Sequence, residues 1–271
     1  MGPDKRVVLG GETSLRGSET SSFWFDPGIH LALAAVTNDI VYALCVLSEK
    51  IKEGLSETQT LDGEEQSLIF SHHISDDHNL ASIRMDMFHL LAAIACEESI
   101  NRFCYFELPR DVTETLEKLQ PTEKLLVAAA FLGQPNMKSS HVYEGLKSLI
   151  GWRNHYAHGH NPGRSTDSLR RNHAVFPEAG EISTLEDDLK ELKKAAGHYR
   201  QIMAWLHKTG IHEISRVSHL QGHASRLVEL LGCFSVTRGW LRPDSEGSRY
   251  QFFGVHVNQE KLTSLQKQVY R

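Results

Sequence analysis

The sequence predicts a mainly α-helical protein, an up-and-down helical bundle with a small C-terminal β-hairpin and helix. Two observations predict this fold class. Apolar residues recur at spacings of three and four over most of residues 28–208, which is the period of helices that bury one face. Beyond residue 231, two β-rich segments flank a turn-forming stretch. We therefore expect a flexible N-terminal segment at 1–25, a helical bundle at 26–210 and a C-terminal extension at 211–271.

The composition is that of an ordinary soluble globular protein, with 40% hydrophobic and 23% charged residues in a chain of 271. The formal net charge is -5 and the sequence pI is near 6.3. A dedicated nucleic-acid-binding domain is usually basic overall. Any contact with RNA must therefore be local, because charge does not attract RNA over the whole surface.

The cysteines and the N-terminus indicate a reduced compartment. No two cysteines have the C-x-x-C spacing, which argues against disulfides and a zinc cage. No apolar segment of a signal peptide follows Met1. The apolar run 29–47 contains Asn38 and Asp39, and we expect it to be too short and polar to span a bilayer. The protein is expected to be cytoplasmic, with no membrane contact.

Several elements precede the segment of interest. Phe23-Trp24-Phe25 is expected to pack on the body of the protein or to form a hydrophobic staple before a helix at 28–54. An acidic loop is expected at 54–66, and a short strand or buried plug at 67–70. The following polar stretch is interpreted as a solvated connector rather than a metal site; its titratable residues are His72, His73, Asp76, Asp77 and His78.

The same reasoning predicts the helices and strands that follow residue 79. A broadly apolar helix is expected at 80–106, and a helix at 112–132 that Pro121 splits. A helix at 141–158 and a helix at 184–208 are separated by a long polar loop. The remaining elements are a helix at 218–231, strands at 233–237 and 250–257, and a last helix from residue 258.

The segment at the end of the 141–158 helix concentrates chemically active residues. Asn154 and His158 lie four apart and share a helix face. Gly159 ends the helix, so that His158 lies in the last turn, where the helix dipole favours an imidazolium. The guanidinium of Arg153 can donate hydrogen bonds to two phosphate oxygens, and a histidine can donate or accept a proton. Three alternatives remain open at this point: this phosphate chemistry, an ordinary capped helix end, and a metal site of His155, His158 and His160. The metal site is disfavoured because no carboxylate or thiolate is near in sequence and Arg153 would repel a cation.

The pattern Arg153-Asn154-x-x-x-His158 resembles the signature of the HEPN superfamily, in which an Arg is followed after four to six residues by a His. The segment 92–103 is similar to the early helix of that family, which carries an acidic residue and often an Asn one turn later. The resemblance covers roughly 80–208. It implies that Glu98 or Glu97 pairs with the arginine across the bundle, and periodicity does not choose between them. The expected supporting residues are Glu98, Asn101, His155 and His160.

The resemblance implies a metal-independent endoribonuclease that needs no cofactor, with Arg153, Asn154 and His158 as catalytic residues. It further implies a homodimer, a role in antiviral defence or as a toxin, and a possible antitoxin or regulatory protein. The polar loop supplies candidate RNA contacts, namely Arg164, Arg170 and Arg171, although its sequence slightly favours an ordinary polar loop. In one subfamily a partner nucleotidyltransferase modifies a Tyr two residues after the His, but here that residue is His160.

A second hypothesis is a non-catalytic HEPN-like module that binds RNA, nucleotide or a protein partner. The acidic pI and the modest local positive charge favour it. No P-loop, G-x-S-x-G, H-E-x-x-H or dinucleotide-binding motif points to another enzyme class.

Overall fold

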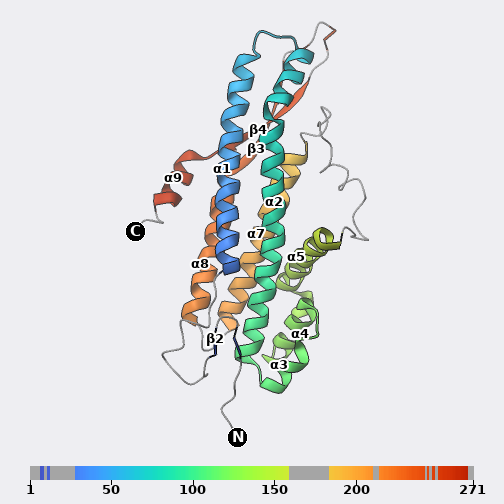
Figure 1. Cartoon of the computed structure of the whole chain (residues 1–271), viewed down its shortest axis with the longest axis vertical. Helices are drawn as coiled ribbons and strands as arrows, with labels where there is room; N and C mark the ends of the chain where they lie inside the picture. The colour runs from blue at the N-terminus through green and yellow to red at the C-terminus, as the bar shows by residue number, and fades with distance from the viewer. Residues whose placement is uncertain are drawn as a thin grey trace.

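The computed structural model describes residues 7–8, 11–12, 28–158, 183–209, 214–241, 243, 246–247 and 250–267. In this part of the chain the protein is mainly helical, with a small antiparallel sheet near the C-terminus, as the sequence predicts. Figure 1 shows an elongated bundle whose long axis follows the first two long helices. Phe23-Trp24-Phe25 and the loop 159–182 lie outside the described residues.

Helices α1 (Gly28–Glu57) and α2 (Gly63–Glu107) form a long antiparallel hairpin. The expected loop at 54–66 is confined to a few residues. For 67–70 the strand is wrong, whereas the alternative, a buried segment, holds for Phe70; the connector expected at 71–79 is wrong. Residues 67–79 belong to α2, which begins where the Asp62 carboxylate accepts the Glu65 backbone N–H at 3.0 Å. Phe70 and Ile74 are buried one turn apart, so this polar stretch still has a helical buried face.

Helix α1 contains a long apolar stretch. With 30 residues it is longer than the expected run, and by length and composition alone it could cross a membrane. Half of its apolar window is buried inside the protein, as in the core helix of a soluble protein. The expectation that this segment is too short and polar to span a bilayer is therefore not supported, and the absence of membrane contact stays a prediction.

Short helices connect the hairpin to the segment of interest. Pro121 divides α3 (Arg110–Leu116) from α4 (Pro121–Phe131), which confirms the expected break. The Gln120 backbone N–H donates to the Glu123 carboxylate at 2.9 Å and so caps the start of α4. A single turn, η2 (Met137–Ser139), precedes α5 (His141–His158), whose bounds agree with those expected.

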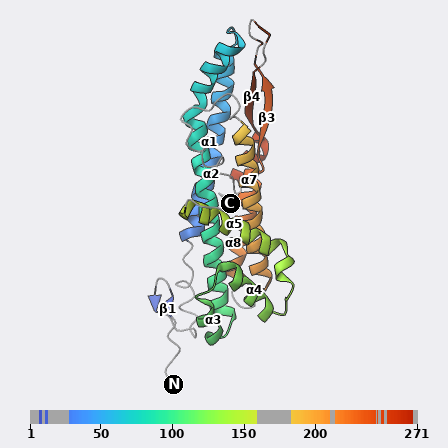
Figure 2. The same cartoon turned by 90° about the vertical axis from the view of Figure 1, so that its right-hand side faces the viewer.

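The C-terminal elements belong to the same body. Helices α7 (Ser183–Thr209) and α8 (Ile214–Leu231) pack on each other and on the first two helices. Strands β3 (Phe234–Trp240) and β4 (Gln251–Val257) form the hairpin, with Phe234 opposite Val257, and α9 (Gln259–Lys267) follows. The hairpin lies beside the upper part of α1 and α2 (Figure 2).

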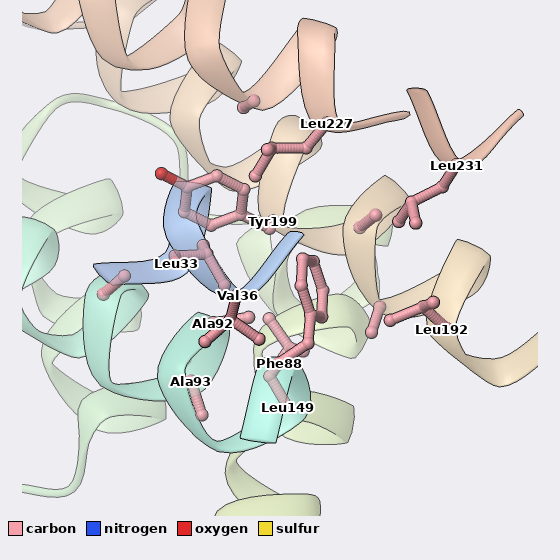
Figure 3. Packing of buried hydrophobic residues seen from close by; sticks show 14 of the residues in the cluster. Leu33, Val36, Phe88, Ala92, Ala93, Leu149, Leu192, Tyr199, Leu227 and Leu231 are labelled. Atoms are coloured by element: carbon pink, nitrogen blue, oxygen red, sulfur yellow. The ribbon is translucent and has the colours of Figure 1, made fainter. Parts of the chain in front are cut away.

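One continuous core lies where five helices meet. In Figure 3, Leu33, Phe88, Leu149 and Tyr199 face one another together with Leu227 of α8. The Ser48 hydroxyl of α1 also donates to the carbonyl of Val255 in β4 at 2.8 Å. The segment after residue 211, expected to be an extension, therefore completes the core of the bundle.

Candidate functional site

The end of α5 meets the middle of α2 through an ion pair. The Nη1 of Arg153 donates to the Oε2 of Glu97, 56 residues away in sequence. Both side chains are partly exposed, 23% for Arg153 and 28% for Glu97. A pair this exposed contributes little to stability, but it fixes where the guanidinium lies.

Asn154 binds the same guanidinium from the neighbouring position. Its Oδ1 accepts from the Nε of Arg153 at 3.3 Å and from Nη2 at 3.2 Å. A guanidinium carries five N–H groups and accepts none, so Glu97 and Asn154 together occupy three of them. Two N–H groups of Arg153 therefore have no partner among the described residues, and they are available to an anion.

Of the two glutamates between which the resemblance did not choose, Glu97 is the one that pairs with Arg153. Glu98, which we expected to support the site, pairs with Arg102 one turn later on α2, at 2.5 Å from Nη2. The two glutamates are adjacent and diverge by about 100° around the helix. Only the placement of α5 on one side of α2 decides which of them meets Arg153.

Asn101, an expected supporting residue, contacts a lysine. Its Oδ1 accepts from the Nζ of Lys124 on α4 at 2.8 Å. Lys124 was not among the expected site residues. It lies on the face of α4 that also buries Pro121, Leu125 and Ala128, so the helical period of that segment could have located it.

An aromatic contact holds α5 against α2 beside the ion pair. The ring of Trp152 lies 4.5 Å, centroid to centroid, from that of His89, which is buried on α2. The Nδ1 of His89 is 2.7 Å from the carbonyl of Met85. Because a carbonyl only accepts, Nδ1 carries the proton and the ring is fixed. This contact packs α5 on α2 one residue before Arg153.

His158 is the last residue of α5. The side chains of residues 155–158 lie outside the described part of the chain, as do His160, Arg164, Arg170 and Arg171. Their expected roles stay predictions. Among the described residues, no group of three His, Cys, Asp or Glu side chains is arranged to hold a metal ion.

A second polar cluster, absent from our expectations, lies in the core. The Nδ1 of His30 on α1 is 2.7 Å from the hydroxyl of Tyr199, and its Nε2 is 3.2 Å from the hydroxyl of Ser99. All three residues are buried. Burial, together with the nearby charges of Arg102 and His223, lowers the pKa of His30 to about 4. The imidazole is therefore neutral at physiological pH and joins α1, α2 and α7 as a hydrogen-bonded core group.

Comparisons of the chain with protein-family models, with curated proteins and with solved structures found no match.

Proposed function

We propose that the protein is a metal-independent endoribonuclease of the HEPN type. The observation that carries this proposal is the state of Arg153. Glu97 and Asn154 orient its guanidinium at the end of α5, two of its N–H groups have no described partner, and the helix ends five residues later at His158. A fixed cation close to a titratable group is what phosphate chemistry requires.

RNA carries its own nucleophile in this proposal. The 2′-hydroxyl loses its proton to a base, its oxygen attacks the phosphorus, and the bond to the 5′-oxygen breaks as an acid donates a proton to it. Arg153 stabilises the charge on the phosphorane, and His158 serves as the acid or base. Asn154 orients the guanidinium through its two contacts. The products are a 2′,3′-cyclic phosphate and a 5′-hydroxyl.

A homodimer is part of the proposal, because a second copy of His158 would supply the other of the two groups, acid and base, that the reaction needs. In support, α2 exposes an apolar stripe along one face: Leu80, Ile83, Met87 and Ile94 are exposed. The spacing of three, four and seven residues continues to Glu97, so that the stripe leads to the ion pair. Exposed apolar stripes of this kind commonly mark protein interfaces.

One observation favours the second candidate, a non-catalytic module that binds RNA, nucleotide or a protein partner. The charge of Arg153 is already balanced by Glu97, and the chain as a whole is acidic. The candidate functions differ in whether the bound nucleic acid is cut. A role in defence or as a toxin, with an antitoxin as partner, stays a prediction.

The test is incubation of purified protein with labelled RNA in excess EDTA. We expect cleavage that Arg153→Ala and His158→Ala each abolish. Arg238→Ala is the matched control, because it removes another Arg–Glu pair, with Glu186, which joins β3 to α7 and includes no proposed site residue. Cleavage that EDTA stops would refute metal independence. RNA that is bound but never cut by the folded protein would leave the binding module as the function.

A further inference from the structure

Lys124 has an unusual environment for a cation. Its side chain starts in the first turn of α4, and the residue is only 8% exposed. Its Nζ makes one hydrogen bond, to the Oδ1 of Asn101 at 2.8 Å. Within the described ranges no carboxylate forms an ion pair with it.

This environment does not favour the charge. Removing an ammonium from water is costly unless an anion compensates for it, and a neutral amide oxygen compensates only in part. The N-terminal end of a helix carries partial positive charge, so a cation in the first turn of α4 is also disfavoured by the helix dipole. Among the described residues, the positive charge of Lys124 therefore has a neutral hydrogen-bond acceptor but no anionic partner.

The contact with Lys124 also sets the orientation of Asn101. An ammonium only donates, so the amide oxygen faces Lys124 and the amide nitrogen, Nδ2, faces away. Asn101 is exposed, and its Nδ2 has no partner among the described residues. Two N–H groups of Nδ2 and two of Nζ therefore have no partner among the described residues, and both kinds of donor suit the oxygens of a phosphate.

This donor group lies next to the ion pair on α2. Asn101 follows Glu97 by four residues, so both face the same side of the helix with side chains about 6 Å apart. Glu97 binds Arg153 and Asn101 binds Lys124, so the two residues of α2 that contact these cations lie one helical turn apart.

We propose that Lys124 and Asn101 form a second phosphate-binding position, which binds the phosphodiester next to the one held by Arg153. The identity of the ligand as RNA rests on the proposed function. Lys124 acts as a point charge that binds phosphate, and Asn101 adds hydrogen bonds from its amide. Neither residue takes part in the transfer of protons; they position the strand.

The test measures binding of a labelled, fully 2′-O-methylated RNA oligonucleotide, which cannot be cut through its 2′-oxygen. Fluorescence anisotropy over a series of salt concentrations gives the affinity and its salt dependence. For Lys124→Met, which keeps the buried stem, we expect about 10-fold weaker binding. The slope of log K against log salt should fall by about 0.7, the value for one phosphate contact on a single strand. Lys124→Arg should retain most of the binding.

Two controls separate a ligand-binding role from a structural role. Lys267→Met removes an exposed lysine of α9, which lies on the other side of the bundle from α4 (Figure 1), and should leave binding unchanged. Thermal unfolding of Lys124→Met should occur at the same temperature as in the wild type or a higher one, because a poorly compensated charge has been removed. A lower unfolding temperature with unchanged RNA binding would make Lys124 structural and overturn the proposal.

The remaining outcomes also test whether Lys124 and Asn101 bind a phosphate. Wild-type affinity and salt slope in Lys124→Met, or no RNA binding by the wild type, would overturn the proposal. Thermal stabilisation by millimolar inorganic phosphate that Lys124→Met abolishes, with RNA binding unchanged, would indicate a free-phosphate site instead. Failure of the proposed nuclease is a different result: the wild type would bind this oligonucleotide but would not cut unmodified RNA, and the effect of Lys124 on binding would still be measured.

Discussion

The Nη1 of Arg153 donates to Glu97 across the packing of α5 on α2, and the adjacent Glu98 turns away to Arg102. This relationship gives two neighbouring glutamates different roles. Glu97 orients Arg153, which binds the phosphate in the proposed mechanism. Glu98 forms an ion pair with Arg102 of its own helix.

The first prediction separates the two glutamates. We expect Glu97→Ala to reduce cleavage about 10- to 100-fold, because a misplaced guanidinium loses contacts in the transition state. The loss should fall mainly on kcat, and Glu97→Gln should restore part of it because its amide oxygen still accepts from Arg153. Glu98→Ala is the matched control and should have a much smaller effect. An equal loss in both variants would show that Glu97 has no specific role.

The second prediction concerns the buried histidine. The pKa of His30 falls from 6.5 to about 4 on folding, so the unfolded chain binds a proton more readily between these two pH values. The stability that neutral His30 contributes is fully present above pH 6.5 and is lost as the pH falls towards 4. Over about 2.5 pH units the loss is on the order of 3 kcal/mol. Urea unfolding at pH 7.5 and pH 4.5 measures it. His30→Phe should lose less stability over this window than the wild type, and an unchanged pH dependence would exclude His30 as its source.

The third prediction tests whether α1 is a core helix. Leu44 is fully buried, and Leu44→Ala should lower the free energy of unfolding by about 2–5 kcal/mol. Leu31 is on the same helix but exposed, so Leu31→Ala should change it by less than about 0.5 kcal/mol. Chemical denaturation of the purified protein gives both values. A large effect at Leu31 would show that something outside the described core covers this face.

The fourth prediction concerns the apolar stripe of α2. Introducing charge with Met87→Glu and Ile94→Glu should convert a dimer to a monomer and reduce cleavage, if the second histidine comes from the partner chain. Sedimentation velocity measures the oligomeric state. Leu68→Glu is the control, because Leu68 is more exposed than either residue but lies near the start of α2, before the stripe. Full activity in a monomeric variant would contradict the need for a second chain.

The helical period predicted most of the fold. The bounds of α5, the break at Pro121 and the C-terminal hairpin all follow from local signals: apolar spacing, a proline and β-rich segments. The first part of α2 was missed because histidines and aspartates dominate it, and the burial that stabilises it comes from α1. A capped start at Asp62, followed by Glu64 and Glu65 in the first turn, was a local sign of the longer helix.

The site could be predicted only in part. The spacing of Arg153, Asn154 and His158 pointed to α5, and an acidic partner on α2 was expected. The choice of Glu97 over Glu98 depends on the side from which α5 approaches, which no local pattern encodes. The role of Lys124 depends on the contact of α4 with α2, and the polar core cluster of His30 depends on three helices meeting. These are consequences of tertiary packing.

The most direct test of the central claim uses an RNA oligonucleotide and a matched copy with a single 2′-deoxy nucleotide at the cleaved position, both in excess EDTA. We expect the protein to cut the first, leaving a 2′,3′-cyclic phosphate and a 5′-hydroxyl, and to leave the second uncut at that position. Cleavage of the deoxy copy at the same position, or products with a 5′-phosphate, would contradict attack by the 2′-hydroxyl and with it the proposed roles of Arg153 and His158.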